Sequence, residues 1–263
     1  MADDLAQLSD DELLRYARQI LLDGWDMDAQ LRLKSARVVI IGAGGLGCPA
    51  SETLVRAGVG SVHLIDDDAI EATNLQRQTL FLPEDIGQSK ALTAAAMLAR
   101  INPLIEAYGT VARLDEDNAY ELLNLASGKP DLLLDCTDNF ATRDVINRIS
   151  VRYQIPLLSA SAIAMQGQLA LFEPHLDTGC YHCVFGALMH DEAADERNCA
   201  NSGVLASTTA VMGNLQANTA LQYLGLTKNP LTNKLLIWDG RQMQQRLMGY
   251  RKDPECPVCS SPD

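Results

Sequence analysis

The chain has 263 residues, with 21 Lys and Arg against 34 Asp and Glu, and therefore carries a formal net charge of -13. This balance argues against a nucleic-acid-binding protein and against attachment to an anionic membrane, because both depend on clustered Lys and Arg. Hydrophobic residues make up 47% of the chain, and this length suits one α/β domain with a large core. With no apolar run near ~18 residues and no signal-peptide pattern, we expect a soluble cytoplasmic protein.

The chain alternates strand-like and helix-like segments. The first helix is expected to begin at a capping box formed by Ser9 and Glu12. Helical spacing is expected at 9–21, 28–34, 46–57, 90–101, 118–126, 141–153 and 204–223, and strands at 37–41, 62–65, 131–135, 156–159, 168–172, 235–238 and 242–247. The early alternation predicts a doubly wound, Rossmann-like, mostly parallel α/β sheet. The late consecutive strands predict an antiparallel C-terminal extension.

A glycine-rich turn follows the first strand. Gly42, Gly44, Gly45 and Gly47 form a G-x-G pattern between a strand and a helix, where backbone amides and the helix dipole favour phosphate groups. Asp66 ends the second strand, at the spacing of a carboxylate that binds ribose hydroxyls. The pattern predicts nucleotide binding. The alternative is a glycine turn that serves only helix–sheet packing.

Several charged residues suggest a triphosphate. Arg77 and Lys90 follow the acidic strand end, and Arg18 lies on the first helix. Three cations with glycine amides suit ATP better than a pyrophosphate alone. Asp138 follows a later strand and is expected at the carboxyl edge of the sheet, where it could hold Mg²⁺. Each of these charges taken alone could also be an ordinary surface charge.

Seven cysteines in a chain expected in the cytosol argue against a disulfide framework. Two C-x-x-C pairs, 72 residues apart, fit a tetrahedral structural zinc site: Cys180, Cys183, Cys256 and Cys259. Two redox dithiols are the alternative. Cys199 precedes a helix beside Arg197, a setting that favours a nucleophilic thiolate, although an unreactive loop cysteine is the other interpretation. Cys48 and Cys136 are expected to be small buried residues.

Together, the motifs resemble the MoeB/ThiF/HesA family, the bacterial relatives of ubiquitin-activating enzymes. The resemblance rests on the segments 15–20, 42–47, 74–78 and 135–139 and on the two cysteine pairs. It implies a homodimeric adenylyltransferase that uses ATP with Mg²⁺ and contains structural zinc. The substrate is the C-terminal glycine of a small ubiquitin-like sulfur carrier, MoaD-type for molybdopterin or ThiS-type for thiamine. Sulfur would come from a separate donor protein.

The resemblance also assigns roles along the chain. It implies that residues 1–263 form one adenylation domain, with N-terminal helices in 1–35, a nucleotide-binding core in 36–173 and a carrier-binding, zinc-linked part in 174–263. Catalytic roles fall on Arg18, which reaches the partner subunit's site, on Arg77, Lys90 and Asp138, and on Cys199 as a covalent sulfur intermediate. ATP-binding roles fall on Gly42, Gly44, Gly45, Gly47, Asp66, Asn74, Arg77, Lys90, Asp138 and Asn139.

Two other functions fit part of the sequence. An NAD-dependent oxidoreductase would explain the glycine turn and Asp66, but it gives Arg18, Arg77 and Lys90 no common purpose. A non-catalytic carrier-binding module would keep the fold and the zinc site without ATP-dependent chemistry. The sequence from Leu205 departs from the Pro-containing pattern of MoeB and ThiF. The motifs leave the choice between a MoaD-type and a ThiS-type carrier open.

Overall fold

The computed structural model describes residues 7–176, 178–187 and 203–260. Its α-helices are α1 (Asp10–Ile20), α2 (Met27–Ser35), α3 (Gly47–Ala57), α4 (Lys90–Ile101), α5 (Ala119–Leu122), α6 (Phe140–Tyr153), α7 (Tyr181–Phe185) and α10 (Ala206–Leu226). Short 3-10 helices lie at η1 (Ala72–Asn74), η2 (Pro83–Asp85) and η3 (Leu125–Ser127). The capping box at the start of α1 is confirmed, because Ser9 and Glu12 exchange hydrogen bonds of 2.7 and 3.3 Å.

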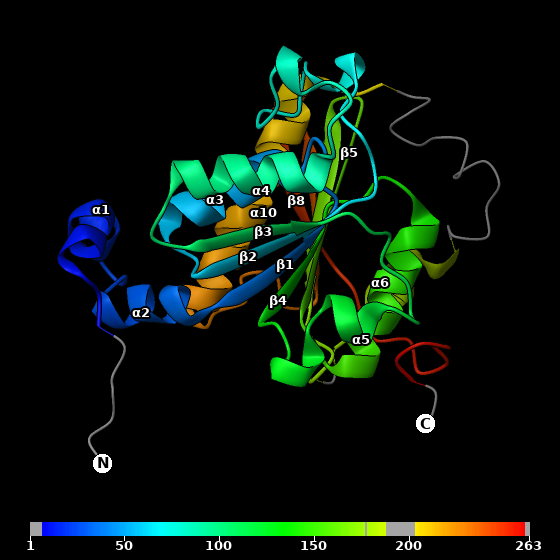
Figure 1. Ribbon diagram of the computed structural model, residues 1–263. Helices are drawn as coiled ribbons and strands as arrows, with labels where there is room; N and C mark the ends of the chain where they lie inside the picture. Colours follow the sequence, from blue (N-terminus) through cyan, green and yellow to red (C-terminus); the bar gives the residue numbers. More distant parts are fainter. Residues whose placement is uncertain (1–6, 177, 188–202, 261–263) are drawn as a thin grey trace.

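The described strands form one eight-stranded sheet (Figure 1). They are β1 (Arg37–Ile41), β2 (Ser61–Ile65), β3 (Glu106–Thr110), β4 (Leu132–Asp135), β5 (Leu157–Ile163), β6 (Gln166–Phe172), β7 (Lys234–Asp239) and β8 (Gln244–Gly249). Their order is β3-β2-β1-β4-β5-β6-β7-β8. The first five are parallel and the last three pair antiparallel. The predicted mostly parallel sheet with an antiparallel C-terminal extension is confirmed.

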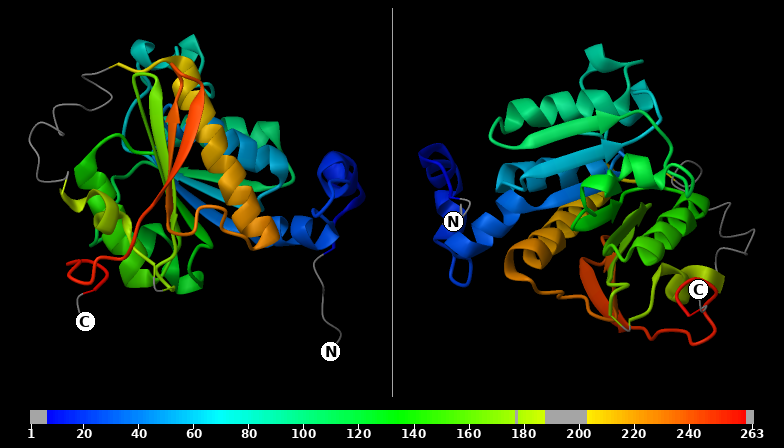
Figure 2. Two further views of the ribbon diagram at one scale, coloured as in Figure 1. Left: turned by 180° about the vertical axis from the view of Figure 1, so that it is seen from behind. Right: turned by 60° about the horizontal axis from the view of Figure 1, so that its bottom comes forward.

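Helices cover both faces of the parallel strands (Figures 1 and 2). Val38 and Ile40 of β1 belong to a core that packs against α3, α4 and α10. Val39 and Ile41 point to the opposite face and join a second core with α6 and α7. Buried side chains on both faces explain why residues 38–41 of β1 are an uninterrupted apolar run. The two-sided packing leaves the carboxyl ends of the strands, with their connecting loops, to form the candidate site.

Two predicted details need correction. Strand β3 was not expected, because Glu106–Thr110 is a half-exposed edge strand without an apolar run. The helix expected at 118–126 is the four-residue α5 followed by η3, since Asn124 has a φ of 50° and ends the α-helical turn. None of the described helices is long and apolar enough to cross a membrane.

Candidate functional site

The glycine-rich turn lies at the topological switch point of the sheet. β1 pairs with β2 on one side and with β4 on the other, so the loops after these three strands meet at one edge. The turn runs from the end of β1 into the first residue of α3, an 11-residue helix. Backbone amides at a helix N-terminus favour an anionic ligand, and in such sheets ligands bind at this edge.

The glycines of the turn serve different purposes. Gly42 has a φ of 96°, and a Cβ there would come within 2.8 Å of the Cys136 carbonyl oxygen. A Cβ on Gly47 would overlap the backbone of Gly42. The fold itself therefore requires these two glycines. Gly44 differs, because a Cβ there would meet nothing nearer than the Gln78 side-chain nitrogen, at 3.7 Å. Open space at Gly44 fits the close approach of a phosphate group.

Asp66 holds the turn in place. One of its carboxylate oxygens accepts a hydrogen bond of 2.7 Å from the Ala43 amide, and the other accepts one of 2.8 Å from the Asp68 amide. Burial raises the pKa of Asp66, while these two backbone hydrogen bonds oppose the rise. The predicted ribose-binding carboxylate is thus fixed against the glycine turn, at the carboxyl end of β2.

Lys90 is a buried cation near Asp66. It is the first residue of α4, its side chain is 9% exposed, and its Nζ donates to an Asp68 carboxylate oxygen at 2.6 Å. A positive charge opposes the helix dipole at this end of a helix. A lysine in this position costs stability, and residues that break a local rule in this way are common at functional sites. Asp68 was missed as a site residue, although it stands in the acidic run after β2.

The loop at 72–78 lies over the glycine turn. Arg77 is half-buried, its Nη1 donates to the Thr73 carbonyl oxygen at 3.1 Å, and a Cβ on Gly45 would come within 3.3 Å of its Cδ. Asn74 caps η1 through a 3.1 Å hydrogen bond from the Glu71 amide. The structure therefore places Arg77 against the glycine turn, and Asn74 is held in the same loop by the Glu71 amide. The Oε1 of the neighbouring Gln78 is buried without a hydrogen bond.

Asp138 and Asn139 follow β4, the strand beside β1. Asn139 caps α6 by accepting from the Thr142 amide at 2.9 Å, and Asp138 is exposed beside it. A buried network around Asp135 anchors this loop. Its carboxylate accepts from the side chains of Ser159 and Thr137 and pairs with Arg143, and Arg143 donates to backbone carbonyls of the same region. The exposed Asp138 carboxylate suits a hydrated Mg²⁺ ion.

Arg18 lies away from this edge within the chain. It is exposed on α1, which packs at the far ends of two helices: Gln19 donates to the Ala57 carbonyl at the end of α3, and Arg15 to the Ile101 carbonyl at the end of α4. The glycine turn lies at the other end of α3. One chain alone therefore does not place Arg18 with Arg77 and Lys90.

The two cysteine pairs come together beside α6 and α7, where the C-terminal segment returns to the body of the chain (Figure 2). The Sγ atoms of Cys180, Cys183, Cys256 and Cys259 all lie within 4.8 Å of one another, and the hydrogen-bonded pairs are 3.5 to 3.9 Å apart. Four sulfurs around zinc at 2.3 Å would lie about 3.8 Å apart. The Asn147 side chain and the Asp253 amide donate to two of these sulfurs.

The other cysteines divide into two groups. Cys48 and Cys136 are buried, as predicted, and burial raises the pKa of both thiols, Cys48 to about 12. Cys199, the predicted sulfur nucleophile, lies outside the described residues.

His182 lies within the first cysteine pair in the sequence, but it is not a member of the four-sulfur cluster. Its ring is 3.4 Å from an Asp144 carboxylate oxygen.

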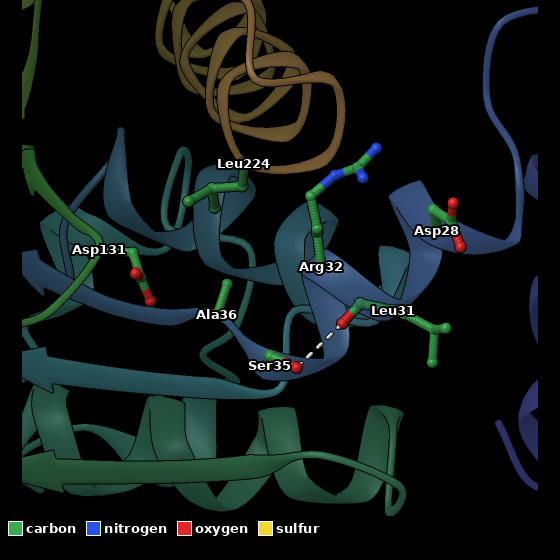
Figure 3. Close-up of a pocket in the computed structure, with 7 residues that line it drawn as sticks. All are labelled: Asp28, Leu31, Arg32, Ser35, Ala36, Asp131 and Leu224. Atoms are coloured by element: carbon green, nitrogen blue, oxygen red, sulfur yellow. Dashed lines mark hydrogen bonds between the residues drawn. The ribbon is translucent and has the colours of Figure 1, made fainter. Parts of the chain in front are cut away.

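A cavity of about 520 Å³ lies at a different place, between α2 and the end of α10 (Figure 3). Arg32 extends along it and donates to the Gly225 carbonyl, and Asp131 and Leu224 line the other side. Arg32 precedes β1 and Asp131 precedes β4, so the cavity is at the amino edge of the sheet. It contains none of the site residues predicted from the sequence.

Comparisons with known proteins identify the family. The ThiF family model matches residues 16–258. The molybdopterin-synthase adenylyltransferase of Salmonella typhimurium is 41% identical over 97% of this chain and 99% of its own length. The sulfur carrier protein ThiS adenylyltransferase of Escherichia coli is also 41% identical, over 96% of this chain and 97% of its own.

A solved structure of Escherichia coli MccB with ATP superposes with a TM-score of 0.75 at 27% identity, and covers 89% of this chain and 69% of MccB. The same α/β architecture is therefore found in a protein whose structure was solved with ATP. The match along almost the whole chain confirms the family resemblance found in the sequence motifs: this chain belongs to the ThiF family.

Proposed function

We propose that this chain uses Mg²⁺ and ATP to adenylate the C-terminal glycine of a small ubiquitin-like sulfur-carrier protein. The observation that carries the proposal is the meeting of the glycine turn, Asp66, Arg77 and Lys90 at one edge of the sheet. Full-length relatives named as adenylyltransferases of this kind support it. An NAD-dependent oxidoreductase or a non-catalytic binding module would not need two cations at this edge.

The reaction requires positioning and charge neutralisation more than a protein nucleophile. A carboxylate oxygen of the carrier attacks the α-phosphorus of ATP. The bond between the α-phosphorus and the bridging oxygen breaks, and pyrophosphate leaves. Asp66 orients the ribose, the amides near Gly44 bind phosphate oxygens, and Lys90 and Arg77 neutralise the charge that develops on the leaving group. The product is an acyl adenylate that a sulfur nucleophile can attack.

The acidic residues at the edge fit a magnesium ion bound largely through water and phosphate oxygens. Mg²⁺ in nucleotide enzymes is held by one or two carboxylates together with the substrate phosphates. Asp138 provides an exposed carboxylate on the loop that touches Gly42. We assign Asp138 the magnesium contact and Asn139 the role of fixing that loop on α6.

The four cysteines fit zinc in a structural role. A site with four protein ligands has no open position for substrate. Its function would be to tie residues 250–260 to α7, in the C-terminal part that we expect to receive the carrier. The hydrogen bond from the Cys180 thiol lowers the pKa of Cys183, which favours the thiolate form that zinc binds.

A homodimer would bring Arg18 to the active site of the second subunit. Arg18 is exposed on α1, four positions after Leu14, which is 81% exposed. Residues four positions apart share a helix face. We propose that this face packs against a second copy of the chain, which would complete the set of three cations around the phosphates.

Carrier-dependent exchange of labelled pyrophosphate into ATP tests the activity. A MoaD-type and a ThiS-type carrier should be assayed side by side with the zinc-loaded protein. Exchange with one carrier supports adenylation and assigns the pathway, and exchange with both indicates a shared activator. Absence of exchange with two intact carriers would refute the proposed substrate class.

Mixing two inactive variants tests the dimeric site. Arg18→Ala and Lys90→Met chains each lack one cation, but a mixed dimer retains one site with both. Random exchange of subunits should restore about a quarter of the wild-type rate, because half of the dimers are mixed and each has one intact site. Failure to recover activity in a mixture shown to contain mixed dimers would exclude the shared site.

A further inference from the structure

The Lys90 side chain has an unusual electrostatic setting. It lies at the positive end of the α4 dipole, with no acidic residue in the first turn of that helix to offset it. Its ammonium group instead pairs at 2.6 Å with Asp68, whose side chain is 66% exposed, on the loop that follows β2. The exposed carboxylate thus directs a cation that is itself almost fully buried.

This ion pair is not needed to hold the loop on α4. The main chain already does so, because the Lys90 amide donates to the Asp68 carbonyl at 3.0 Å and the Ile70 amide donates to the Gln88 carbonyl at 2.8 Å. Ala69 and Ser89 form a β-bridge at the same place. The side-chain contact therefore calls for an explanation other than folding.

Asp68 is linked to the nucleotide edge through Asp66. The Asp68 amide donates to one oxygen of Asp66, and the other oxygen of Asp66 accepts from the Ala43 amide in the glycine turn. A continuous series of hydrogen bonds therefore connects the turn, the ribose carboxylate and the lysine. Each group would fix the place of the next one relative to the phosphates.

We infer that Asp68 is a positioning residue, which holds the Lys90 ammonium group in the orientation that meets the phosphates of ATP. The part of this inference that concerns the reaction rests on the proposed function, whereas the part that concerns ATP binding does not. An ammonium group has three donors, so Lys90 can keep its bond to Asp68 while it donates to a phosphate oxygen. Asp68 itself does not contact the reacting atoms.

The neighbouring Asp67 provides a control that distinguishes a positioning role of Asp68 from an effect of its negative charge alone. A carboxylate near a triphosphate repels it, so Asp67→Asn should leave the KM for ATP unchanged or lower it, whereas Asp68→Asn also loses the directed Lys90 contact and should not bind ATP more tightly. Only Asp68→Asn removes the ion pair with Lys90. We therefore expect its kcat to fall by about tenfold or more, the range seen when a group that orients a functional ligand is removed. Asp67→Asn should keep the wild-type kcat, and both variants should keep the wild-type melting temperature.

A double-mutant cycle on ATP binding tests the inference without any carrier. Calorimetry with Mg²⁺ and ATP should show that Lys90→Met weakens binding about tenfold in the wild-type background. In the Asp68→Asn background the same change should weaken it by less than about threefold, because the ammonium group is no longer directed at the phosphates. The matching cycle with Asp67→Asn should show no such coupling.

The outcomes are distinct. Coupling in the Asp68 cycle alone, together with the selective loss of kcat, supports the inference. Additive effects of Asp68→Asn and Lys90→Met, or equal behaviour of Asp67→Asn and Asp68→Asn, would overturn it. The Asp68 cycle could show this coupling in ATP binding while the wild-type protein exchanges no pyrophosphate with either carrier. In that case the proposed substrate is wrong and the positioning role stands.

Discussion

Replacing Lys90 with Met separates catalysis from folding. Met keeps an unbranched side chain in the buried space and removes only the charge. The change loses an ion pair with an exposed partner, a loss of about 0–1 kcal/mol. It also removes a cation from a helix N-terminus, a gain of about 0.3–1 kcal/mol. These terms nearly cancel, so the free energy of unfolding should change by less than about 1 kcal/mol and the melting temperature by no more than about 2–4 °C.

The effect on the rate should be much larger. Removing one group that stabilises charge in a transition state typically lowers kcat by a factor of ~10²–10³. Carrier-dependent pyrophosphate exchange measures the rate, and thermal unfolding measures the stability. Lys129→Met is the matched control, because this exposed lysine also makes a hydrogen bond, to the Gln154 carbonyl, but lies before β4 at the amino edge of the sheet. A normal exchange rate in Lys90→Met would refute the catalytic role of Lys90.

Further changes test the site and the fold. Gly44→Ala should weaken ATP binding by about tenfold or more at an unchanged melting temperature, since a Cβ there fits the protein but meets a phosphate. Gly42→Ala should instead destabilise the protein, because Gly42 has a φ of 96°. Asp138→Ala should lower the exchange rate by ~10²–10³, and a wild-type rate at limiting Mg²⁺ would count against the magnesium contact. Chelating zinc should lower the melting temperature, and an unchanged value in a protein shown to be zinc-free would rule out the structural role. Burial, with a smaller effect of Arg37, lowers the pKa of His63 to about 4. Because the unfolded chain binds this proton near pH 6.5, His63 should contribute a loss of about 2–3 kcal/mol of stability between pH 7 and 4.5. In urea unfolding, His63→Gln should therefore lose less stability than the wild type over this range.

The parallel core could be predicted because its signals are local in sequence. β1 is a run of five residues that ends in glycines, and the acid at 66 follows the next run directly. β3 gave no such signal, because Glu106–Thr110 lies at the sheet edge and contains Gly109. The structure explains this glycine: a Cβ would overlap the backbone of Ala91 in α4. That requirement comes from helix–sheet packing, which the sequence does not display.

The sequence predicts which residues belong to the candidate site, but it does not predict which of their side chains pair with one another. The glycine turn, Asp66, Arg77 and Lys90 were each found from a motif or from the family resemblance. The pairing of Lys90 with Asp68 depends on a 22-residue connection that brings α4 back to the end of β2. The position of Arg18 was equally hidden, since the sequence gives no measure of its distance from the turn. Pairings of this kind follow from topology, and they decide which charges act together.

The candidate site is the place where the chain departs from the local rules that it obeys elsewhere. Away from the site, Ser9 caps α1 through a full capping box, and Arg56 pairs with Glu52 along α3. At the site, a lysine begins a helix, and partial burial raises the pKa of the Asp66 carboxyl group. Each departure costs stability, and nothing in the packing of the sheet requires it. A nucleotide would make both departures favourable. Its polyphosphate supplies negative charge to Lys90, and its ribose supplies hydroxyl donors to Asp66.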